Sequence, residues 1–266
     1  MRASRKTDLS RLRRILYGGI AVVFWLIVWE VIARTVDLSF ALPGVLETLG
    51  AFASLLLQGT FWKTVLLSLG RIALGLLIGV VVGILLAVVS VRVAAVDAIL
   101  SPAMVFIRST PVASFILVLW VIIGRAAVPV VIAVLMVIPI VYQNICTSLQ
   151  SLDTHLSDML TVFHVSPLRR FRILVLPSML RYLIPAFVTA AGLSWKAGIA
   201  AEIIAYTKDS IGRSIANAKN EFDGPAMFAW TMAVVLLSFG IEKLLTFIGR
   251  RANRRVALYQ PSDESL

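Results

Sequence analysis

The sequence predicts an all-α integral membrane protein with six membrane-spanning helices, and three observations support that fold class. First, 59% of the 266 residues are hydrophobic and only 15% are charged, whereas a soluble domain carries roughly 25% charged residues. Second, the apolar residues form six long runs. Third, the basic residues lie mainly in the segments that flank those runs. A chain of this composition, with a mean hydropathy of +0.94, has too few polar residues to cover a water-soluble globule.

Each of the six runs is long enough to cross a bilayer, which takes about 20 predominantly apolar residues in a helix. The second and fourth are the clearest, because residues 72–91 and 126–152 contain no charged residue. The fifth is the weakest, because Lys196 and Glu202 lie within it. The expected spans are residues 15–34, 65–90, 103–123, 127–147, 183–205 and 228–248.

The basic flanks predict the orientation of the spans, because cytoplasmic segments of membrane proteins carry an excess of lysine and arginine. Such residues precede the first span and follow the sixth: Arg2, Arg5, Lys6, Arg11, Arg13, Arg14, Arg250, Arg251, Arg254 and Arg255. Both ends are therefore expected in the cytoplasm, which requires an even number of spans. This predicts a basic tail at 1–14, a single transmembrane domain at 15–249 and a cytoplasmic tail at 250–266. The stretch 207–224 then lies outside, where it is expected to fold back as a short amphipathic piece.

The same residues argue against several other classes of protein. A net charge of +11 would suit nucleic-acid binding, but the basic residues alternate with apolar spans. The basic start leads into an apolar run without a small-residue cleavage site, so we expect the first span to be retained. The single cysteine, Cys146, cannot form an internal disulfide and is interpreted as a packing residue. No P-loop, zinc-protease or nucleophile-elbow motif occurs, and His155 and His164 lack partners at metal-ligand spacing. Neither a catalytic nor a metal site is expected.

Residues 153–177 interrupt the apolar pattern between the fourth and fifth spans, on the predicted cytoplasmic side. Apolar residues at three- and four-residue spacing predict one stripe of a helix: Leu152, Leu156, Met159, Leu160 and Phe163. Ser166 followed by Pro167 predicts the start of a second helix, with a side-chain cap and proline in the first position. That second helix is expected to end near Pro177. The segment is thus predicted to be a helix, a turn and a helix at the membrane surface.

The second span carries a small residue at every fourth position: Gly75, Gly79, Gly83 and Ala87. Such a stripe forms a smooth helix face that lets another backbone come close. We favour packing within the bundle as its purpose, with a subunit interface as the alternative.

Several motifs resemble those of the membrane subunits of bacterial ABC importers. The pattern Phe163-x-Val165-Ser166-x-x-Arg169 through Leu176-Pro177 resembles their cytoplasmic "EAA" loop. Other motifs narrow the resemblance to permeases of the nitrate/sulfonate/taurine group: Leu42-Pro43, Ser68-Leu69-x-Arg71, Arg108-Ser109-x-Pro111, Ser194-Trp195-Lys196-Ala197-Gly198-Ile199-Ala200-Ala201-Glu202, Phe228-Ala229-Trp230-Thr231 and Glu242-Lys243-Leu244. The sequence departs from the family at two places. Asp158, Met159 and Leu160 replace Glu-Ala-Ala, and His164 replaces the loop glycine.

The resemblance implies the type I ABC importer permease fold, with a cytoplasmic coupling helix between spans four and five. This helix is expected to sit in a groove on a separate ATP-binding subunit. That subunit would bind and hydrolyse ATP, so this chain is expected to be no enzyme and to hold no cofactor. Met159 and Leu160 are expected to pack back onto the spans. The residues expected to contact the ATPase subunit are Asp158, Phe163, His164, Val165, Ser166 and Pro167.

The resemblance also implies an assembly in the bacterial inner membrane. We expect two copies of the permease as a homodimer, two ATP-binding subunits and an extracytoplasmic solute-binding protein. The expected function is ATP-driven import of a small anionic solute such as nitrate, a sulfonate or taurine. The alternative cargo is a precursor related to thiamine or riboflavin. A stand-alone secondary transporter or channel would usually carry more spans or an internal repeat, and we find no repeat. A membrane-embedded enzyme would need a catalytic constellation that we do not find.

The charged residues of the fifth span are candidate pathway residues. A charge in the bilayer interior costs roughly 2.5–3.5 kcal/mol on insertion scales, so it normally faces protein or water. Lys196 either lines the route of an anion, pairs with an acid on another helix or reaches a cytoplasmic cavity. Glu202 lies nearer the outer end and is interpreted as a solvated or gating residue. Arg71 and Arg108 are interpreted as helix-end anchors rather than ligands.

Overall fold

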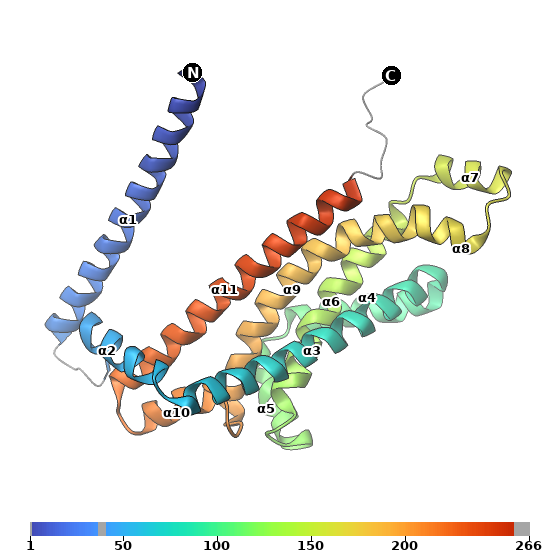
Figure 1. Ribbon diagram of the computed structural model, residues 1–266. Helices are drawn as coiled ribbons and strands as arrows, with labels where there is room; N and C mark the ends of the chain where they lie inside the picture. The colour runs from blue at the N-terminus through green and yellow to red at the C-terminus, as the bar shows by residue number, and fades with distance from the viewer. Residues whose placement is uncertain (1, 37–40, 258–266) are drawn as a thin grey trace. The chain divides into compact units, whose positions relative to one another are not determined.

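The computed structural model describes residues 2–36 and 41–257, with side chains described for 16–36 and 41–251. Within these residues the regular structure is helical throughout (Figure 1). The elements are α1 (Arg2–Val36), α2 (Val45–Leu56), α3 (Gly59–Arg92), α4 (Ala94–Ser109), α5 (Val112–Ile123), α6 (Val128–Gln150), α7 (Thr154–Val162), α8 (Pro167–Arg170), a π-helical turn (Phe171–Val175), α9 (Leu176–Ala205), α10 (Ile211–Asn220) and α11 (Gly224–Ala257).

The chain divides into two compact units. The first comprises Met1–Trp62 and Ser214–Ala233, and the second comprises Lys63–Arg213 and Val234–Leu266. Every residue proposed from the sequence as a coupling or pathway residue belongs to the second unit.

In the first unit, α1 is tied to the start of α2. The Glu30 carboxylate accepts a hydrogen bond from the backbone N–H of Val45 at 2.8 Å. Aromatic packing joins the rest of the unit, where the ring centroids of Phe61 and Trp230 are 5.0 Å apart. These contacts connect segments that are far apart in the sequence.

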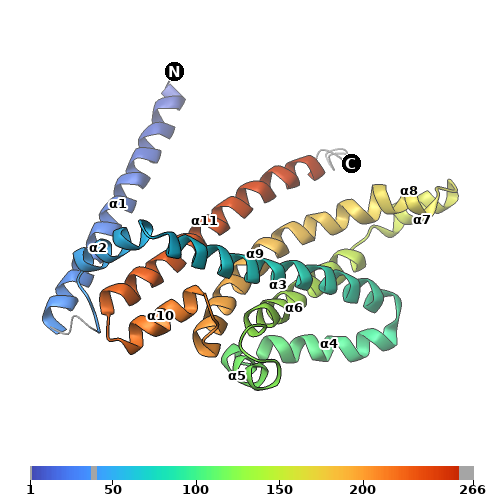
Figure 2. The same ribbon diagram turned by 60° about the horizontal axis from the view of Figure 1, so that its bottom comes forward.

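In the second unit, α6 and α9 lie side by side at the centre (Figure 2). Its main core consists of apolar side chains from α3, α4, α6 and α9: Ala87, Met104, Val137, Ile138, Val141, Tyr142, Ile145, Cys146, Met179 and Ala190. The buried Cys146 is therefore a packing residue, as predicted.

The glycine stripe of α3 packs directly against α6. A β-carbon at Gly75 would lie 2.6 Å from the backbone oxygen of Val130, and one at Gly79 would lie 2.7 Å from the Val137 β-carbon. Real β-carbons do not approach other atoms this closely, so only glycine allows the two helices this separation. Gly83 is similarly close to Val141. The prediction that this stripe serves packing within the bundle is confirmed.

The spans agree with the sequence prediction except at the third. Among the described residues, five helices are long and apolar enough to cross a membrane, and α4 with α5 makes a sixth only if this pair, bent by 103°, counts as one span. The bend lies at Thr110 and Pro111, between the two helices. Proline disfavours helical backbone at the residue before it, and Thr110 is extended with ψ 133°. The continuous span expected at 103–123 is therefore two helices.

The helix that begins at Pro167 does not end near Pro177, so that prediction is wrong. α8, the π-helical turn and α9 form one continuous helical stretch of 39 residues, from Pro167 to Ala205. Proline lacks a backbone N–H and its ring collides with a regular helical carbonyl four residues back. The π-helical turn directly before α9 removes the regular pattern, because the N–H of Leu176 donates to Phe171 O, five residues back. Pro177 then lies in the first turn of α9.

The predicted amphipathic piece after the fifth span is α10. Its buried face includes Ile211 and Ala218, whereas Lys219 and Asn220 are exposed. The helix is ten residues long, and its N-terminal end enters the polar cluster described below.

Candidate functional site

Residues 153–170 form the predicted helix, turn and helix. The side chain of Asp153 caps α7 by accepting a hydrogen bond from the backbone N–H of Leu156 at 3.2 Å. Ser166 occupies the N-cap position of α8 and Pro167 its first turn, as predicted. The Ser166 side chain makes no capping hydrogen bond, so that detail of the prediction is wrong.

The turn after α7 takes a left-handed conformation at His164, with φ +50°. The N–H of His164 donates to Thr161 O at 3.0 Å, and the N–H of Val165 donates to Leu160 O at 3.0 Å. This pair of bonds defines the Schellman motif, which normally has glycine at the left-handed position. His164 therefore adopts the backbone conformation for which glycine is the usual residue. The two bonds of the motif thus form although His164 stands where the family has glycine.

Arg170 connects the two helices of this segment. Its guanidinium donates through Nη1 to Thr161 Oγ1 at 3.1 Å and through Nη2 to the hydroxyl of Ser157. Both hydroxyls are on α7, whereas Arg170 ends α8. The sequence analysis did not single out Arg170 as a site residue. The off-stripe positions of Ser157 and Thr161 were the available signal for such a contact.

The side chains predicted to contact an ATPase subunit lie mostly on the surface of the chain. Asp158, His164, Ser166 and Pro167 are exposed, Val165 is half-buried, and Phe163 is 73% exposed. Of the two residues expected to pack back onto the spans, Leu160 is buried at 7% exposure, but Met159 is 48% exposed. The expectation for Met159 is therefore wrong, because its side chain stays about half exposed on α7.

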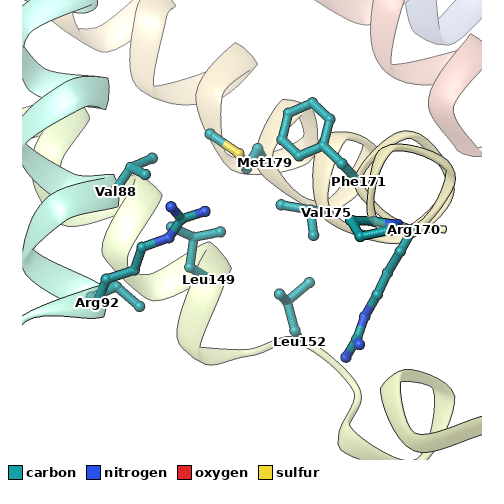
Figure 3. Close-up of a pocket in the computed structure, with 10 residues that line it drawn as sticks. Val88, Arg92, Leu149, Leu152, Arg170, Phe171, Val175 and Met179 are labelled. Carbon is teal, nitrogen blue, oxygen red and sulfur yellow. The ribbon is translucent and has the colours of Figure 1, made fainter. Parts of the chain in front are cut away.

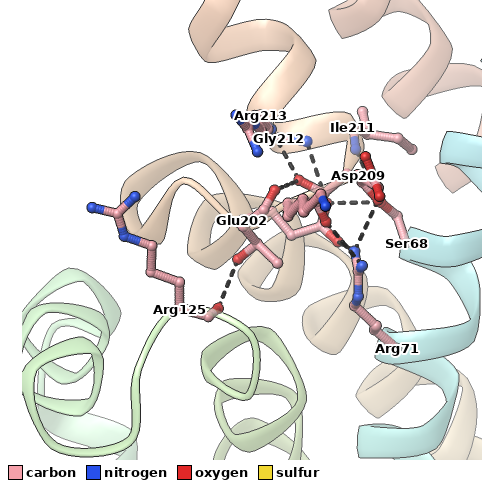
Figure 4. Close-up of polar contacts among 11 residues, drawn as sticks. Ser68, Arg71, Arg125, Glu202, Asp209, Ile211, Gly212 and Arg213 are labelled. Carbon is pink, nitrogen blue, oxygen red and sulfur yellow. Dashed lines mark hydrogen bonds and ion pairs between the residues drawn. The ribbon is translucent and has the colours of Figure 1, made fainter.

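At the other end of α9, Glu202 forms the centre of a buried polar cluster (Figure 4). Its side chain is completely buried, so the interpretation of a solvated residue is wrong. Its Oε2 accepts hydrogen bonds from the Ser68 hydroxyl at 2.8 Å and from the Gly212 N–H at 3.2 Å. Its Oε1 lies 3.6 Å from Nη1 of Arg71. The carboxylate thus joins α9 to α3 and to the first turn of α10, where helical N–H groups favour negative charge.

Arg71 also fixes the turn between α9 and α10. Its guanidinium donates to Asp209 O at 3.0 Å and to Lys208 O at 2.9 Å. The expected role as an anchor therefore fits, although Arg71 lies well inside α3 rather than at its end. The Ser68 hydroxyl in turn accepts the N–H of Ile211 at 3.0 Å.

Gly212 is required by the close approach of α10 to α9. A β-carbon at this position would lie 2.4 Å from the Glu202 β-carbon. Sequence reasoning did not include Ser68 or Gly212 among the site residues, although Ser68 stands in the quoted Ser68-Leu69-x-Arg71 motif.

Lys196 lies on the same helix as Glu202 but in a different environment. Its side chain is exposed, as are those of Thr189 and Leu193 on the same face of α9. None of the carboxylates in the described part of the chain forms an ion pair with it. Lys196 precedes Ala205 by roughly 14 Å along the helix axis, at about 1.5 Å per residue. One alternative for Lys196 was pairing with an acid on another helix. The described part of the chain does not contain such a pair.

The described residues contain no group of three or more His, Cys, Asp or Glu side chains arranged to hold a metal ion. The polar chemistry of the second unit is instead divided between the exposed segment at one end of the 167–205 helix and the buried cluster at the other.

Solved structures with a similar fold are transport proteins. A crystal structure of an amino acid ABC transporter with histidines matches with a TM-score of 0.59 at 16% identity, covering 72% of this chain and 93% of that one. The MetNI methionine ABC transporter in an inward-facing conformation matches with a TM-score of 0.56 at 21% identity, covering 77% and 97%. These likenesses show the fold, which is that of the ABC importer permeases.

The sequence family is given by two further comparisons. Residues 79–256 match the family of binding-protein-dependent transport system inner membrane components. The bicarbonate transport system permease protein CmpB of Synechocystis sp. is 28% identical over 200 residues, which cover 69% of each chain. The chain belongs to the binding-protein-dependent transport system inner membrane component family.

Four predictions are thereby confirmed. The resemblance to ABC permeases of the nitrate/sulfonate/taurine type is correct, and so is the all-α permease fold, with six spans when the bent pair counts as one. The protein is a multi-pass membrane protein. It is a transport permease subunit.

Proposed function

We propose that this chain forms the translocation pathway of an ATP-driven importer for a small anionic solute and is coupled to a separate ATPase subunit through residues 155–167. The observation that carries the proposal is the exposed, internally connected helix–turn–helix that continues without a break into a membrane-spanning helix.

The exposed end of this segment suits a protein partner. Phe163 is a large aromatic side chain left 73% exposed beside the turn, and aromatic residues are enriched among those that dominate binding energy at interfaces. The Schellman turn and the Arg170 contacts hold the backbone around Phe163 in one conformation. A contact surface held in its bound shape loses less entropy when it binds. The proposed contact set is Asp158, Phe163, His164, Val165, Ser166 and Pro167.

Movement of this segment would be transmitted along the 39-residue helical stretch. The stretch carries Lys196 on an exposed face, and Glu202 near its far end connects it to α3 and α10. A displacement at the turn therefore reaches the candidate pathway residues through continuous hydrogen-bonded helix rather than through a loop. The proposed gating role of Glu202 would act through this cluster.

The anionic substrate class rests on two observations. The relative CmpB is named for bicarbonate, an anion. Lys196 adds an exposed positive charge inside a membrane-spanning helix, where an unpaired charge normally faces protein or water. We therefore propose that Lys196 faces the pathway and attracts the anion.

The complete transporter would contain a second copy of this chain, two ATP-binding subunits that carry the nucleotide, and an extracytoplasmic solute-binding protein. The basic flanks orient both termini and the 155–167 segment toward the cytoplasm of a bacterium. The domain organisation into two tails and a single transmembrane domain remains a prediction.

The coupling proposal is tested by co-purifying the full-length chain with the ATPase subunit encoded with it. Phe163→Ala should weaken their association about 30-fold, because loss of a central aromatic contact costs about 2 kcal/mol. Thr154→Ala is the matched control, because Thr154 is exposed on α7 and lies outside residues 155–167. If both variants retain the ATPase as the wild type does, the coupling assignment is wrong. Uptake that persists without any ATPase would instead indicate a stand-alone transporter.

The pathway proposal is tested by ATP-driven uptake of labelled bicarbonate, nitrate and taurine into vesicles. Lys196→Met should reduce uptake of the transported anion, while Lys196→Arg, which keeps the charge, should retain most of it. Both variants should still co-purify with the ATPase, which separates this test from the preceding one. Unchanged uptake by Lys196→Met would make Lys196 a structural residue.

A further inference from the structure

A pocket of about 310 Å³ opens where α3 and α6 end and α8 passes into α9 (Figure 3). It lies at residues 153–177, called the coupling segment below. Its walls are mainly apolar and include Val88, Leu149, Leu152, Phe171 and Val175. Its volume is in the range of small-ligand sites. The function proposed above uses one residue of its lining, Pro167, but assigns no ligand to the pocket.

Two arginines line the pocket, and they differ in what they bind. Arg170 extends toward α7, where its guanidinium is occupied by Ser157 and Thr161 (Figure 3). Arg92 ends α3, and its side chain lies across the pocket from that of Arg170 (Figure 3). Arg92 has neither an ion-pair nor a hydrogen-bond partner among the described side chains. The pocket therefore combines apolar walls with one available cation.

The position of the pocket decides what kind of anion could fill it. Arg92 is in the last turn of a membrane-spanning helix, and a basic segment that includes Arg169, Arg170 and Arg172 lies on the same side. This is the boundary between hydrocarbon and water, where basic pockets between spans accommodate anionic lipid headgroups. A free inorganic anion would satisfy Arg92 but would leave the apolar walls facing water.

We propose that this pocket binds one anionic phospholipid, with the headgroup phosphate on Arg92 and the adjoining part of an acyl chain against Val88, Leu149 and Val175. Such a lipid would contact α3, α6 and the π-helical turn at once. It would thus join the membrane to the point where the coupling segment meets α9. The inference does not depend on which solute the protein transports.

The test is native mass spectrometry of the delipidated full-length chain with phosphatidylglycerol or phosphatidylcholine of identical acyl chains. We expect one tightly retained phosphatidylglycerol per chain and a preference of about fivefold over phosphatidylcholine, the effect of one arginine near a lipid phosphate. Arg92→Gln should abolish the preference. Arg250→Gln, a change of an exposed arginine outside the pocket, should leave it unchanged.

A second pair of variants tests the apolar part of the site. Val91→Trp places a bulky side chain at the pocket lining and should displace the lipid, whereas Val89→Trp lies on the same helix outside the lining and should not. The proposal is overturned if Arg92→Gln retains the preference for phosphatidylglycerol. It is also overturned if inorganic phosphate displaces the lipid completely, which indicates a simple anion site. Loss of lipid binding when the ATPase subunit is added would show that the subunit fills the pocket instead.

Discussion

The coupling segment and the Glu202 cluster occupy opposite ends of one helical stretch and use polar residues in opposite ways. In the coupling segment, Asp158, His164 and Ser166 point to the outside of the chain. In the cluster, Glu202 is completely buried and is bonded to Ser68 and Gly212. Exposed polar groups form hydrogen bonds with water and remain available to a partner. Buried polar groups must form their hydrogen bonds within the chain. One end therefore leaves polar groups free for the proposed partner, whereas the other fixes helices to each other.

Glu202→Ala is expected to have the largest effect on stability. It removes the acceptor of Ser68 and Gly212 and the ionic partner of Arg71, and breaking a buried ion pair costs about 3–5 kcal/mol. The measurement is the thermal unfolding midpoint of the purified full-length chain in detergent. Glu242→Ala, at an exposed position of α11, is the control and should change stability by less than about 0.5 kcal/mol. Equal effects of the two variants would contradict the conclusion that the Glu202 cluster fixes the helices to each other.

Gly212→Ala is expected to have the next largest effect, because the added β-carbon would lie 2.4 Å from the Glu202 β-carbon. Overpacking of this kind costs about 1–3 kcal/mol. The control is Gly192→Ala in α9, where no atom lies within 4 Å of the added carbon and helix propensity favours alanine by up to about 1 kcal/mol. The same unfolding assay should therefore give opposite signs for the two variants. A Gly212→Ala chain as stable as the wild type would show that α10 can move away from α9.

His164→Gly is expected to have the smallest effect and to be stabilising. It relieves a left-handed conformation that costs residues other than glycine roughly 1–2 kcal/mol, so the free energy of unfolding should rise by about 1 kcal/mol. His155→Gly, inside α7, should instead lower stability by about 0.5 kcal/mol because glycine is the poorer helix former. If His164→Gly destabilises the chain, the turn differs from the Schellman motif described above.

The sequence predicted the spans well because hydropathy and charge are local properties of the chain. The break at Pro111 could also have been predicted from the sequence, because proline restricts the backbone of Thr110 before it. Pro177 was misread for the opposite reason, because a π-helical turn accommodated a residue that ordinarily ends a helix. Rules based on a single segment therefore predicted the spans, but they failed at Pro177, where the backbone hydrogen-bond pattern changes.

The buried cluster could not be predicted in this way. Glu202 is satisfied by Ser68, which lies 134 residues earlier in the chain, and no periodicity or composition connects two such positions. The same limit applies to Arg170, whose partners are on another helix, and to Met159, whose exposure depends on what lies beside α7. The conformation of His164 was not predicted, although the glycine that the family has at this place is the residue that most readily adopts a left-handed conformation.

The π-helical turn at Phe171–Val175 affects the direction in which the coupling segment is presented relative to α9. Successive residues of an α-helix are rotated by about 100° around its axis, so one extra residue in a turn rotates everything before it relative to everything after it. The turn therefore sets the angle at which Phe163 is presented relative to the face of α9 that carries Lys196. A chain with one residue deleted from this turn would keep its spans and its coupling segment. It would present that segment to a different side.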